Sequence, residues 1–274
     1  MLGTCFNCQE KLRPGMSKCV NCGHWNFSQE VALHTPKILL SSVVPTPQNR
    51  ILTNFCDECF GGGIQRTSVT LLAGEPGAGK STLLLQLAQS VVLSPEKIAS
   101  SAGDIILYIL TEEGEEPVKE RADRLQLKYQ DSIVLVNAMG GMVGLTHLLE
   151  DMKPLVTILD SLTGFTGSNK KEEAIQVIRA LKSYAEKNHS PAIVIDHVTK
   201  EIDFAGYMSL LHAVDCLLML EGAKKMVRTL TTDKSRNGPA PVSLRFEMTE
   251  LGLIPEKEKE MMSIETFTKL GSKT

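Results

Sequence analysis

The sequence predicts an α/β fold around a mostly parallel β-sheet, preceded by a small module that holds four cysteines. Three observations predict this architecture. Short apolar runs alternate with helical patterns from Ser68 onward, a glycine-rich segment joins the first run to a helix, and two Cys-x-x-Cys pairs open the chain. Of the 274 residues, 42% are hydrophobic and 22% are charged, an ordinary globular mixture that can bury a core.

The overall charge limits the partners that the chain can bind. Lys and Arg total 29 against 32 Asp and Glu, which gives a formal net charge of −3. A globally basic nucleic-acid coat is therefore excluded, and any contact with DNA or RNA must come from local loops. No apolar run approaches the roughly 18 residues that a membrane-spanning helix needs, and Met1–Cys5 lacks the basic start of a signal peptide. We expect a cytoplasmic protein with no membrane partner.

The first element of the chain is the pair of knuckles Cys5-x-x-Cys8 and Cys19-x-x-Cys22. Two knuckles can present four thiolates to one ion, a spacing typical of tetrahedral zinc sites. Fewer than about 40 residues rarely build a core of their own, so metal binding would supply the folding energy. Four free thiols or two redox pairs are the alternatives, but a redox pair usually stands alone beside a βαβ unit. We predict a zinc-binding knuckle, or zinc ribbon, over residues 1–27.

A linker and a tail flank the predicted α/β domain. Residues 28–49 hold several prolines among Ser and Thr, which is the composition of a linker. We place the α/β domain at residues 50–255 and a C-terminal tail at 256–274. A third pair, Cys56-x-x-Cys59, has no partner pair nearby, and we interpret it as incidental.

From Ser68 the chain alternates between strand patterns and helices. Six runs are short, apolar and rich in Leu or β-branched residues: Val69–Ala73, Ile105–Leu110, Ile133–Val136, Leu155–Leu159, Ala192–Ile195 and Val214–Leu220. Between two of these runs, Glu172–Lys187 places apolar residues at helical spacing. Strands that are buried on both faces and separated by helices indicate a parallel sheet.

The glycine-rich segment follows the strand Val69–Ala73 and precedes the helical run Thr82–Val92. Its glycines let the backbone wrap around phosphates, and the start of the helix presents N–H groups to an anion. Lys80 would reach the β- and γ-phosphates, and the Ser81 hydroxyl would ligate magnesium. A chance glycine-rich turn is the alternative, which the flanking strand and helix disfavour. The predicted nucleotide-binding residues are Gly74, Glu75, Pro76, Gly77, Ala78, Gly79, Lys80, Ser81 and Thr82.

Three more strand ends supply polar groups that the hydrolysis of a nucleoside triphosphate requires. Asp160 ends an apolar run, where it could hold magnesium through water. Glu112 and Glu113 follow a second run, and either carboxylate could orient or deprotonate the attacking water. A solvated acidic loop is the alternative for these two. His197 follows a third run and could sense the γ-phosphate, although a lone His is more often structural.

Together these segments resemble the RecA-type ATPases, and specifically the bacterial RadA (Sms) recombination and branch-migration motors. The resemblance covers nearly the whole chain. Its motifs occur in the family's order: the four-cysteine knuckle with Trp25-Asn26, Phe60–Ile64, Gly74–Gln86, Glu112-Glu113 with Arg121–Leu125, Asp160-Ser161, and His197–Glu201. The resemblance implies a RecA-like P-loop ATPase core that binds ATP and magnesium. In that core Glu112 would activate water, Asp160 would hold magnesium and His197 would sense the γ-phosphate.

The resemblance also implies two cations that act across a subunit interface. The family carries a Lys-Asn-Arg-Phe-Gly motif that reaches into a neighbour's ATP site, and the matching segment here is Lys234-Ser-Arg236-Asn-Gly238. Both cations are kept, while the Asn and Phe are replaced. Surface cations in a turn before Pro239 are the alternative. RadA proteins continue into a Lon-protease-like domain that binds DNA, and this sequence ends about where that domain would begin, after Leu253. A short, divergent version would suit a bacterial mobile element or a phage.

In RecA-type rings, two loops that face the central channel touch single-stranded DNA. By resemblance, these loops would be Ser161–Glu172, with Lys170 and Lys171, and Thr199–Ser209, with Lys200 and Tyr207. Contacts to backbone phosphates and stacking on an aromatic ring would give a grip that is independent of sequence. Ordinary solvated lysines are the alternative.

We therefore expect an ATP hydrolase with DNA helicase activity that forms a homo-oligomeric ring, a hexamer, on single-stranded DNA. It would act in recombination, branch migration or replication, and a recombinase or replication protein would bind the zinc knuckle. One alternative is a phage replicative helicase of the DnaB class. Another is a non-translocating ATP-dependent switch that binds a partner through the knuckle. DNA-stimulated ATPase activity separates a motor from a switch.

Overall fold

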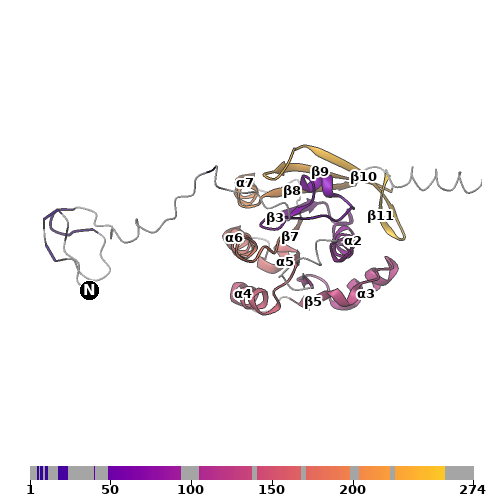
Figure 1. The fold of residues 1–274 in the computed structure, drawn as a ribbon, viewed down its shortest axis with the longest axis horizontal. Coiled ribbons are helices and arrows are strands. Elements are labelled where there is room, and N and C mark those ends of the chain that lie inside the picture. The colour runs from indigo at the N-terminus through magenta and orange to yellow at the C-terminus, as the bar shows by residue number, and fades with distance from the viewer. Residues whose placement is uncertain are drawn as a thin grey trace, which may run out of the picture. The chain divides into compact units, whose positions relative to one another are not determined.

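The computed structural model describes residues 5, 7–8, 10–11, 18–23, 40, 49–93, 105–137, 141–167, 171–197, 204–222 and 226–256. The chain divides into two units, Met1–Thr46 and Pro47–Thr274, and the larger unit contains the α/β domain (Figure 1). Within the described ranges, no helix combines the length and the apolar character needed to cross a membrane.

A nine-stranded sheet forms the centre of the larger unit, in the order β11-β10-β9-β8-β3-β7-β6-β4-β5. Six of its strands run parallel: β3 (Val69–Gly74), β4 (Ile106–Leu110), β5 (Ile133–Asn137), β6 (Val156–Asp160), β7 (Ala192–His197) and β8 (Cys216–Gly222). The parallel α/β architecture is confirmed, and each predicted strand is found within two residues of its expected bounds. Because the strands are parallel, their carboxyl ends lie at one edge of the sheet.

Three antiparallel strands extend the sheet beyond β8: β9 (Val227–Ser235), β10 (Val242–Thr249) and β11 (Gly252–Pro255). These three strands were not predicted, because a continuous apolar run marks a strand buried on both faces, whereas β9 and β10 are largely half-exposed. A separate small sheet pairs β1 (Arg50–Ile51) with β2 (Ile64–Gln65), and the 3-10 helix η2 (Asp57–Phe60) joins these strands in sequence.

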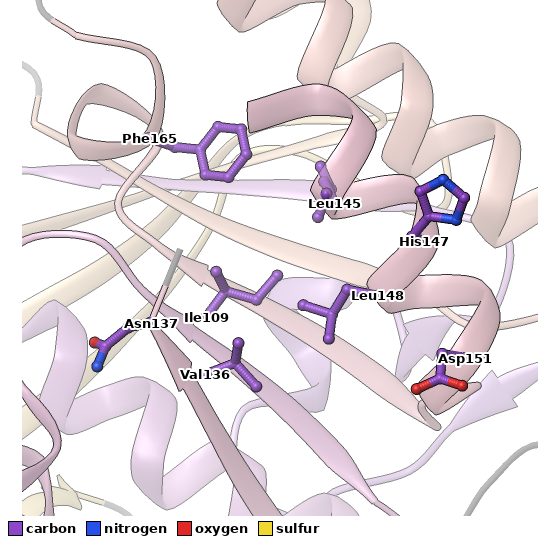
Figure 2. Close-up of a pocket in the computed structure, with 9 residues that line it drawn as sticks. Ile109, Val136, Asn137, Leu145, His147, Leu148, Asp151 and Phe165 are labelled. Atoms are coloured by element: carbon purple, nitrogen blue, oxygen red, sulfur yellow. The ribbon is translucent and has the colours of Figure 1, made fainter. Parts of the chain in front are cut away.

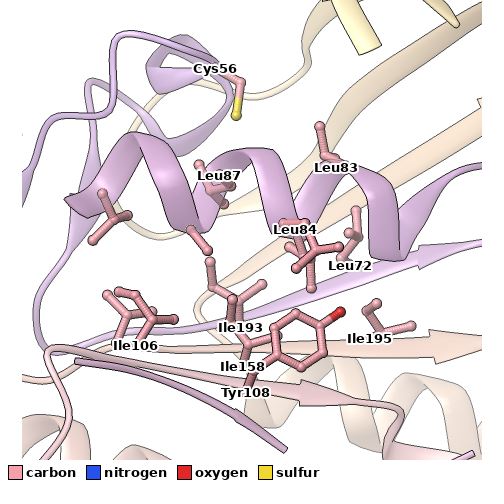
Figure 3. Packing of buried hydrophobic residues seen from close by; sticks show 14 of the residues in the cluster. Cys56, Leu72, Leu83, Leu84, Leu87, Ile106, Tyr108, Ile158, Ile193 and Ile195 are labelled. Carbon is pink, nitrogen blue, oxygen red and sulfur yellow. The ribbon is translucent and has the colours of Figure 1, made fainter. Parts of the chain in front are cut away.

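Helices cover both faces of the sheet (Figure 1). On one face lie α2 (Lys80–Val92) and α3 (Glu115–Arg124), and on the other lie α4 (Gly141–Met152), α6 (Lys171–Asn188) and α7 (Phe204–Ala213). The short α5 (Leu162–Thr166) follows β6. Figure 3 shows α2 lying over the strand side chains Leu72, Ile106, Ile158 and Ile193, all of which are buried. Burying one such side chain contributes about 1.5–3 kcal/mol, so this layer fixes α2 and the loop before it on the sheet.

Candidate active site at the carboxyl edge of the sheet

The predicted phosphate loop connects β3 to α2 at the carboxyl edge of the sheet. Gly74, Gly77 and Gly79 have φ angles of 152°, 76° and 103°, which favour glycine. A Cβ atom on Gly74 would also lie 2.3 Å from the carbonyl oxygen of Leu220 in β8. No side chain of the described residues caps the start of α2, so the N–H groups of its first turn can bind an anion. The loop therefore has a backbone suited to phosphate.

The Lys80 side chain is buried within this loop. Its Nζ donates to the carbonyl oxygens of Gly74 and Glu75, at 2.8 and 3.0 Å. Burial lowers the pKa of Lys80. Three nearby carboxylates raise the same pKa: Asp160, Asp196 and Glu112. The ammonium group thus sits among carboxylates, with two carbonyl partners that phosphate oxygens could replace.

Asp160 ends β6, close to the start of α2. Its Oδ2 accepts a hydrogen bond from the Tyr108 hydroxyl at 2.8 Å. Burial raises the pKa of Asp160, while the nearby hydroxyls of Ser81 and Tyr108 lower it. Hydroxyl and carboxylate oxygens are the hard ligands that Mg²⁺ prefers. Ser81 and Asp160 therefore fit the predicted magnesium site.

Glu112 follows β4 and contacts the residue after Asp160. The Ser161 hydroxyl donates to Oε1 of Glu112, and the Ser161 side chain is fully buried. Thr111 orders the same corner, because its Oγ1 accepts from the Ser161 N–H at 2.6 Å and lies 2.9 Å from the carbonyl oxygen of Asp160. A Cβ atom on Gly164 would lie 2.7 Å from Cγ of Glu112, so the start of α5 packs closely against this side chain. The Glu112 carboxylate is thereby held at the carboxyl edge of the sheet.

Glu113, the other candidate for activating water, is paired with an arginine. The two terminal nitrogens of Arg121 in α3 donate to Oε1 and Oε2 of Glu113, at 2.7 and 3.0 Å. The hydrogen bond to Glu113 raises the pKa of Arg121. A bidentate guanidinium occupies both oxygens of a carboxylate. Glu113 is therefore held by α3, whereas Glu112 is held by Ser161 at the end of β6.

The strand between β3 and β6, which is β7, ends with Asp196 and His197. Asp196 is buried and accepts a hydrogen bond from the Thr163 hydroxyl. The sequence analysis missed Asp196, although a carboxylate at the end of an apolar strand was the signal that identified Asp160. His197 pairs in register with Gly74, so its backbone lies beside the phosphate loop. Its side chain lies outside the described part of the structure.

The antiparallel strands that the sequence analysis missed also contact the phosphate loop. Nε of Arg228 in β9 donates to the carbonyl oxygen of Ala78 at 2.9 Å. The side chain of Gln86 in α2 exchanges hydrogen bonds with the backbone of Leu253 in β11, at 2.8 and 3.1 Å. These bonds tie both the loop and the helix after it to the extension of the sheet.

Lys234 and Arg236, the cations predicted to act on a neighbouring subunit, contact the carboxyl end of α7 in their own chain. Nζ of Lys234 donates to the carbonyl oxygens of Leu211 and, at 2.8 Å, Val214. Arg236 donates to a third carbonyl oxygen at 3.0 Å and lies 3.5 Å from the carboxylate of Asp215. Burial lowers the pKa of Lys234. The Arg236 side chain is 54% exposed, so a second subunit could still reach it.

The turn after β9 is docked on the glycine-rich motif Phe60–Ile64. Arg50 donates to the carbonyl oxygen of Asn237 at 2.6 Å and to two carbonyl oxygens of that motif at 3.0 and 3.2 Å. A Cβ atom on Gly61 would lie 2.8 Å from Cα of Gly238, so the two backbones touch. The motif therefore holds the turn that carries Arg236, directly after the strand β9 that contains Lys234.

The residues predicted to contact DNA are only partly described. Lys170 and Lys200 lie outside the described residues, and Lys171 and Tyr207 are described by their backbones alone, in α6 and α7. Parts of both predicted loops are helical instead, namely α5 and the first turns of α7. For α5 the reason is an N-cap that the sequence analysis overlooked, since the Ser161 hydroxyl accepts a hydrogen bond from the backbone N–H three residues later, at 3.1 Å.

The four cysteines of the predicted knuckle lie together in the smaller unit. The sulfur atoms of Cys5, Cys8, Cys19 and Cys22 all lie within 4.8 Å of one another. The Sγ atoms of Cys5 and Cys22 are 3.6 Å apart, as are those of Cys8 and Cys19. Two sulfur atoms of a tetrahedral zinc site, with bonds of about 2.3 Å, are separated by about 3.8 Å. The predicted four-cysteine cluster is confirmed, and its geometry fits zinc.

A pocket of about 510 Å³ lies elsewhere in the domain, between α4 and the carboxyl ends of β4 and β5 (Figure 2). Its lining is largely apolar, with Ile109, Val136, Leu145, Leu148 and Phe165. His147 and Asp151 of α4 add two polar groups on the helix side. Its described lining includes none of the predicted site residues, so this pocket is distinct from the candidate nucleotide site.

Comparison with known proteins gives one family and several relatives. The family described as "ATPase: KaiC" matches residues 51–255. Proteins named DNA repair protein RadA match nearly the whole chain: 29% identity over 92% of this chain in Aquifex aeolicus, 30% over 91% in Mycolicibacterium smegmatis and 31% over 86% in Mycobacterium tuberculosis. These alignments cover 59%, 58% and 52% of the relatives, so the chain spans little more than half of their length.

A solved structure shows the same fold. A KaiC-like protein from Pyrococcus horikoshii aligns with a TM-score of 0.60, covering 75% of this chain and 98% of that one. The two sequences are 14% identical, so this likeness concerns the fold alone.

Proposed function

The chain belongs to the KaiC family of ATPases, and from that premise we propose that it is a RadA-like motor that hydrolyses ATP in DNA repair and recombination. One observation carries the proposal: polar groups from three strand ends meet at one edge of the sheet. The Ser81 hydroxyl lies near enough to Asp160 to lower the pKa of that carboxyl, and Lys80 is within electrostatic reach of Asp160 and Glu112. A phosphate loop, a magnesium-binding carboxylate and a second carboxylate near the attacking water are the parts that P-loop hydrolysis of ATP needs.

Each of these groups has a distinct task. Lys80 and the N–H groups at the start of α2 bind the phosphates, and Ser81 and Asp160 hold Mg²⁺. When bound, that ion neutralises charge on the phosphate oxygens. Glu112 orients the attacking water and accepts its proton, while Ser161 holds the carboxylate in place. His197, at the end of the strand beside the loop, senses the γ-phosphate.

Assembly into a ring, which we propose is a hexamer, completes the site. A neighbour's Arg236 would stabilise the charge that develops on the γ-phosphate during transfer, with Lys234 of the adjoining strand setting its position. The exposed guanidinium of Arg236 and the docking of its turn on the motif that contains Gly61 support this role. Single-stranded DNA would run past Lys170, Lys171, Lys200 and Tyr207, which grip phosphates and stack on bases.

The four-cysteine knuckle has a separate role in this proposal. Bound zinc gives the small unit its fold, and the folded knuckle binds a recombinase or replication protein. The sulfur separations of 3.6 Å support zinc as the ion.

A non-translocating switch is the second candidate, because Lys234 and Arg236 bind α7 of their own chain. In a switch the two cations would stay with α7, and the nucleotide state would control partner binding through the knuckle. Such a protein would hydrolyse ATP at a rate that DNA does not change.

The test is the ATPase rate of the full chain with and without single-stranded DNA, with Lys80→Ala as the inactive control. A motor gives Mg²⁺-dependent hydrolysis that DNA stimulates, and a switch gives hydrolysis that DNA does not affect. Absence of hydrolysis under both conditions contradicts the proposal. For a DNA-stimulated enzyme, migration of a three-strand junction indicates a RadA-like motor, and unwinding of a forked duplex indicates a replicative helicase.

A further inference from the structure

Tyr108 lies in the middle of β4, on the face that α2 covers, and its side chain is fully buried. In the register of β4 and β6, Tyr108 pairs with Ile158, and Leu110 pairs with Asp160. Tyr108 therefore shares a face of the sheet with Asp160 and lies two positions earlier along the strands. Figure 3 shows its hydroxyl directed toward the Leu83 end of α2, which is the end that follows the phosphate loop.

A hydroxyl group at this position requires an explanation, because the side chains around Tyr108 are mostly aliphatic. Burying a hydroxyl without a hydrogen bond is unfavourable, and Phe would fill nearly the same volume without that cost. Within the described residues, the bond that satisfies this hydroxyl is the one to Oδ2 of Asp160, at 2.8 Å.

We propose that Tyr108 is a positioning residue for magnesium: its hydroxyl holds one oxygen of Asp160, so that the remaining lone pairs face Ser81 and the metal. This inference rests on the proposed function, in which Ser81 and Asp160 hold the ion. Thr111 fixes the backbone at the end of β6, and Tyr108 fixes the side chain. A carboxylate that is already oriented loses less freedom when the metal binds, which is how partners of metal ligands raise affinity.

The experiment measures how strongly magnesium and nucleotide binding are coupled. The dissociation constant of a fluorescent ADP analogue is measured on the full chain in Mg²⁺ and in EDTA, and the ratio of the two constants gives the coupling. In Tyr108→Phe, we expect the affinity in EDTA to stay unchanged and the ratio to fall about tenfold, a factor typical of losing one hydrogen bond to a charged group. The Mg²⁺ concentration for half-saturation should rise accordingly.

Tyr184 offers a matched control. It is also buried, and its hydroxyl donates to the carbonyl oxygen of Leu149 at 2.8 Å, within the core on the other face of the sheet. Tyr184→Phe removes the same group and should leave both dissociation constants unchanged. This control separates the position of the lost hydroxyl from the general cost of losing a buried hydrogen bond.

A double variant keeps the inference testable if Tyr108→Phe does not fold. Asp160→Asn should abolish most of the coupling, and Tyr108→Phe added to Asp160→Asn should reduce it no further. The double variant replaces the carboxylate by a neutral amide and so leaves no unpaired buried charge; it is expected to fold, which thermal melting checks. A further drop of the ratio in the double variant would show that Tyr108 does not act through Asp160.

Two results overturn the inference directly. An unchanged ratio in Tyr108→Phe would show that the hydroxyl does not position the carboxylate. An equal loss of affinity in Mg²⁺ and in EDTA would show a damaged phosphate loop instead. The proposed function fails separately: a chain that binds Mg²⁺-nucleotide without hydrolysing ATP contradicts the motor, while a tenfold drop in the ratio still supports Tyr108. A wild-type chain that binds no nucleotide overturns both.

Discussion

Glu112 and Glu113 are neighbours in sequence, but they have different partners, and substituting each by glutamine separates their roles. Glutamine keeps the shape of glutamate and cannot take a proton from water. The amide oxygen in Glu112→Gln can still accept a hydrogen bond from Ser161, so we expect the fold and ATP binding to be unchanged. Glu113→Gln instead breaks the bidentate pair with Arg121.

The Glu112 substitution is expected to change the turnover number, and the Glu113 substitution is expected to change stability. Loss of a general base lowers turnover by about a hundredfold or more, and a hundredfold corresponds to about 2.7 kcal/mol in activation free energy. The side chains of Arg121 and Glu113 are 23% and 27% exposed, so their pair is partly shielded from water. We expect Glu113→Gln to lower the free energy of unfolding by about 1 kcal/mol. In a domain of this size, that lowers the melting temperature by about 2–4 °C.

The assay combines the turnover number at saturating Mg²⁺-ATP with thermal melting of the same preparations. Glu116→Gln is a matched control, because Glu116 is an exposed carboxylate in the first turn of α3. Glu112→Gln should lose turnover and keep its melting temperature, and Glu113→Gln should do the reverse. Normal hydrolysis by Glu112→Gln with loss of turnover in Glu113→Gln would refute the reasoning and assign water activation to Glu113.

Three further predictions concern the loop, the knuckle and the interface. Lys80→Ala removes the cation on the phosphates and should abolish hydrolysis, and steady-state rates near those of wild type would exclude this role. Cys19→Ser should remove about one zinc per chain, as measured by metal analysis, and leave the ATPase rate unchanged; native protein without zinc would contradict the knuckle. Arg236→Ala should reduce hydrolysis about a thousandfold, and mixed rings with Lys80→Ala should regain activity because some interfaces pair an intact site with an intact Arg236. Full activity of Arg236→Ala alone would end the trans assignment.

The elements that sequence predicted well carry local signals. The strand of Val69, its glycine-rich loop and the helix after it are recognisable from adjacent residues, because phosphate binding requires glycine at positive φ followed by a helix start. The four-cysteine cluster was predictable because the two cysteines of each Cys-x-x-Cys pair are only three residues apart in the sequence. The helix predicted at Glu172–Lys187 is found as α6, since its apolar residues recur at helical spacing.

The parts that sequence missed depend on contacts between distant segments. Tyr108 reads as one more apolar strand residue, and its role follows only from a register that places it near Asp160, 52 residues later. The strands β9 and β10 are largely half-exposed, and tertiary contacts such as the bond from Arg228 to Ala78 make them part of the site. Asp196 carried a usable signal, because it ends a buried strand as Asp160 does.

The sequence predicted that both Lys234 and Arg236 act on a neighbouring subunit, but their contacts in the structure differ. Nζ of Lys234 is half-buried and serves two carbonyl groups at the carboxyl end of α7. Withdrawing it would leave those carbonyls without their donor, at a cost of about 1–3 kcal/mol for each buried group.

Arg236 is more exposed, and its 3.5 Å contact with Asp215 is long. Asp215 also forms a 2.7 Å ion pair with Lys182, so its negative charge still has a positive partner when Arg236 moves away. Breaking the own-chain contacts of Arg236 therefore costs less free energy than breaking those of Lys234, and Lys234 can remain in place to anchor α7. We infer that Arg236 alone crosses to the neighbouring site and that Lys234 sets the position from which it does so.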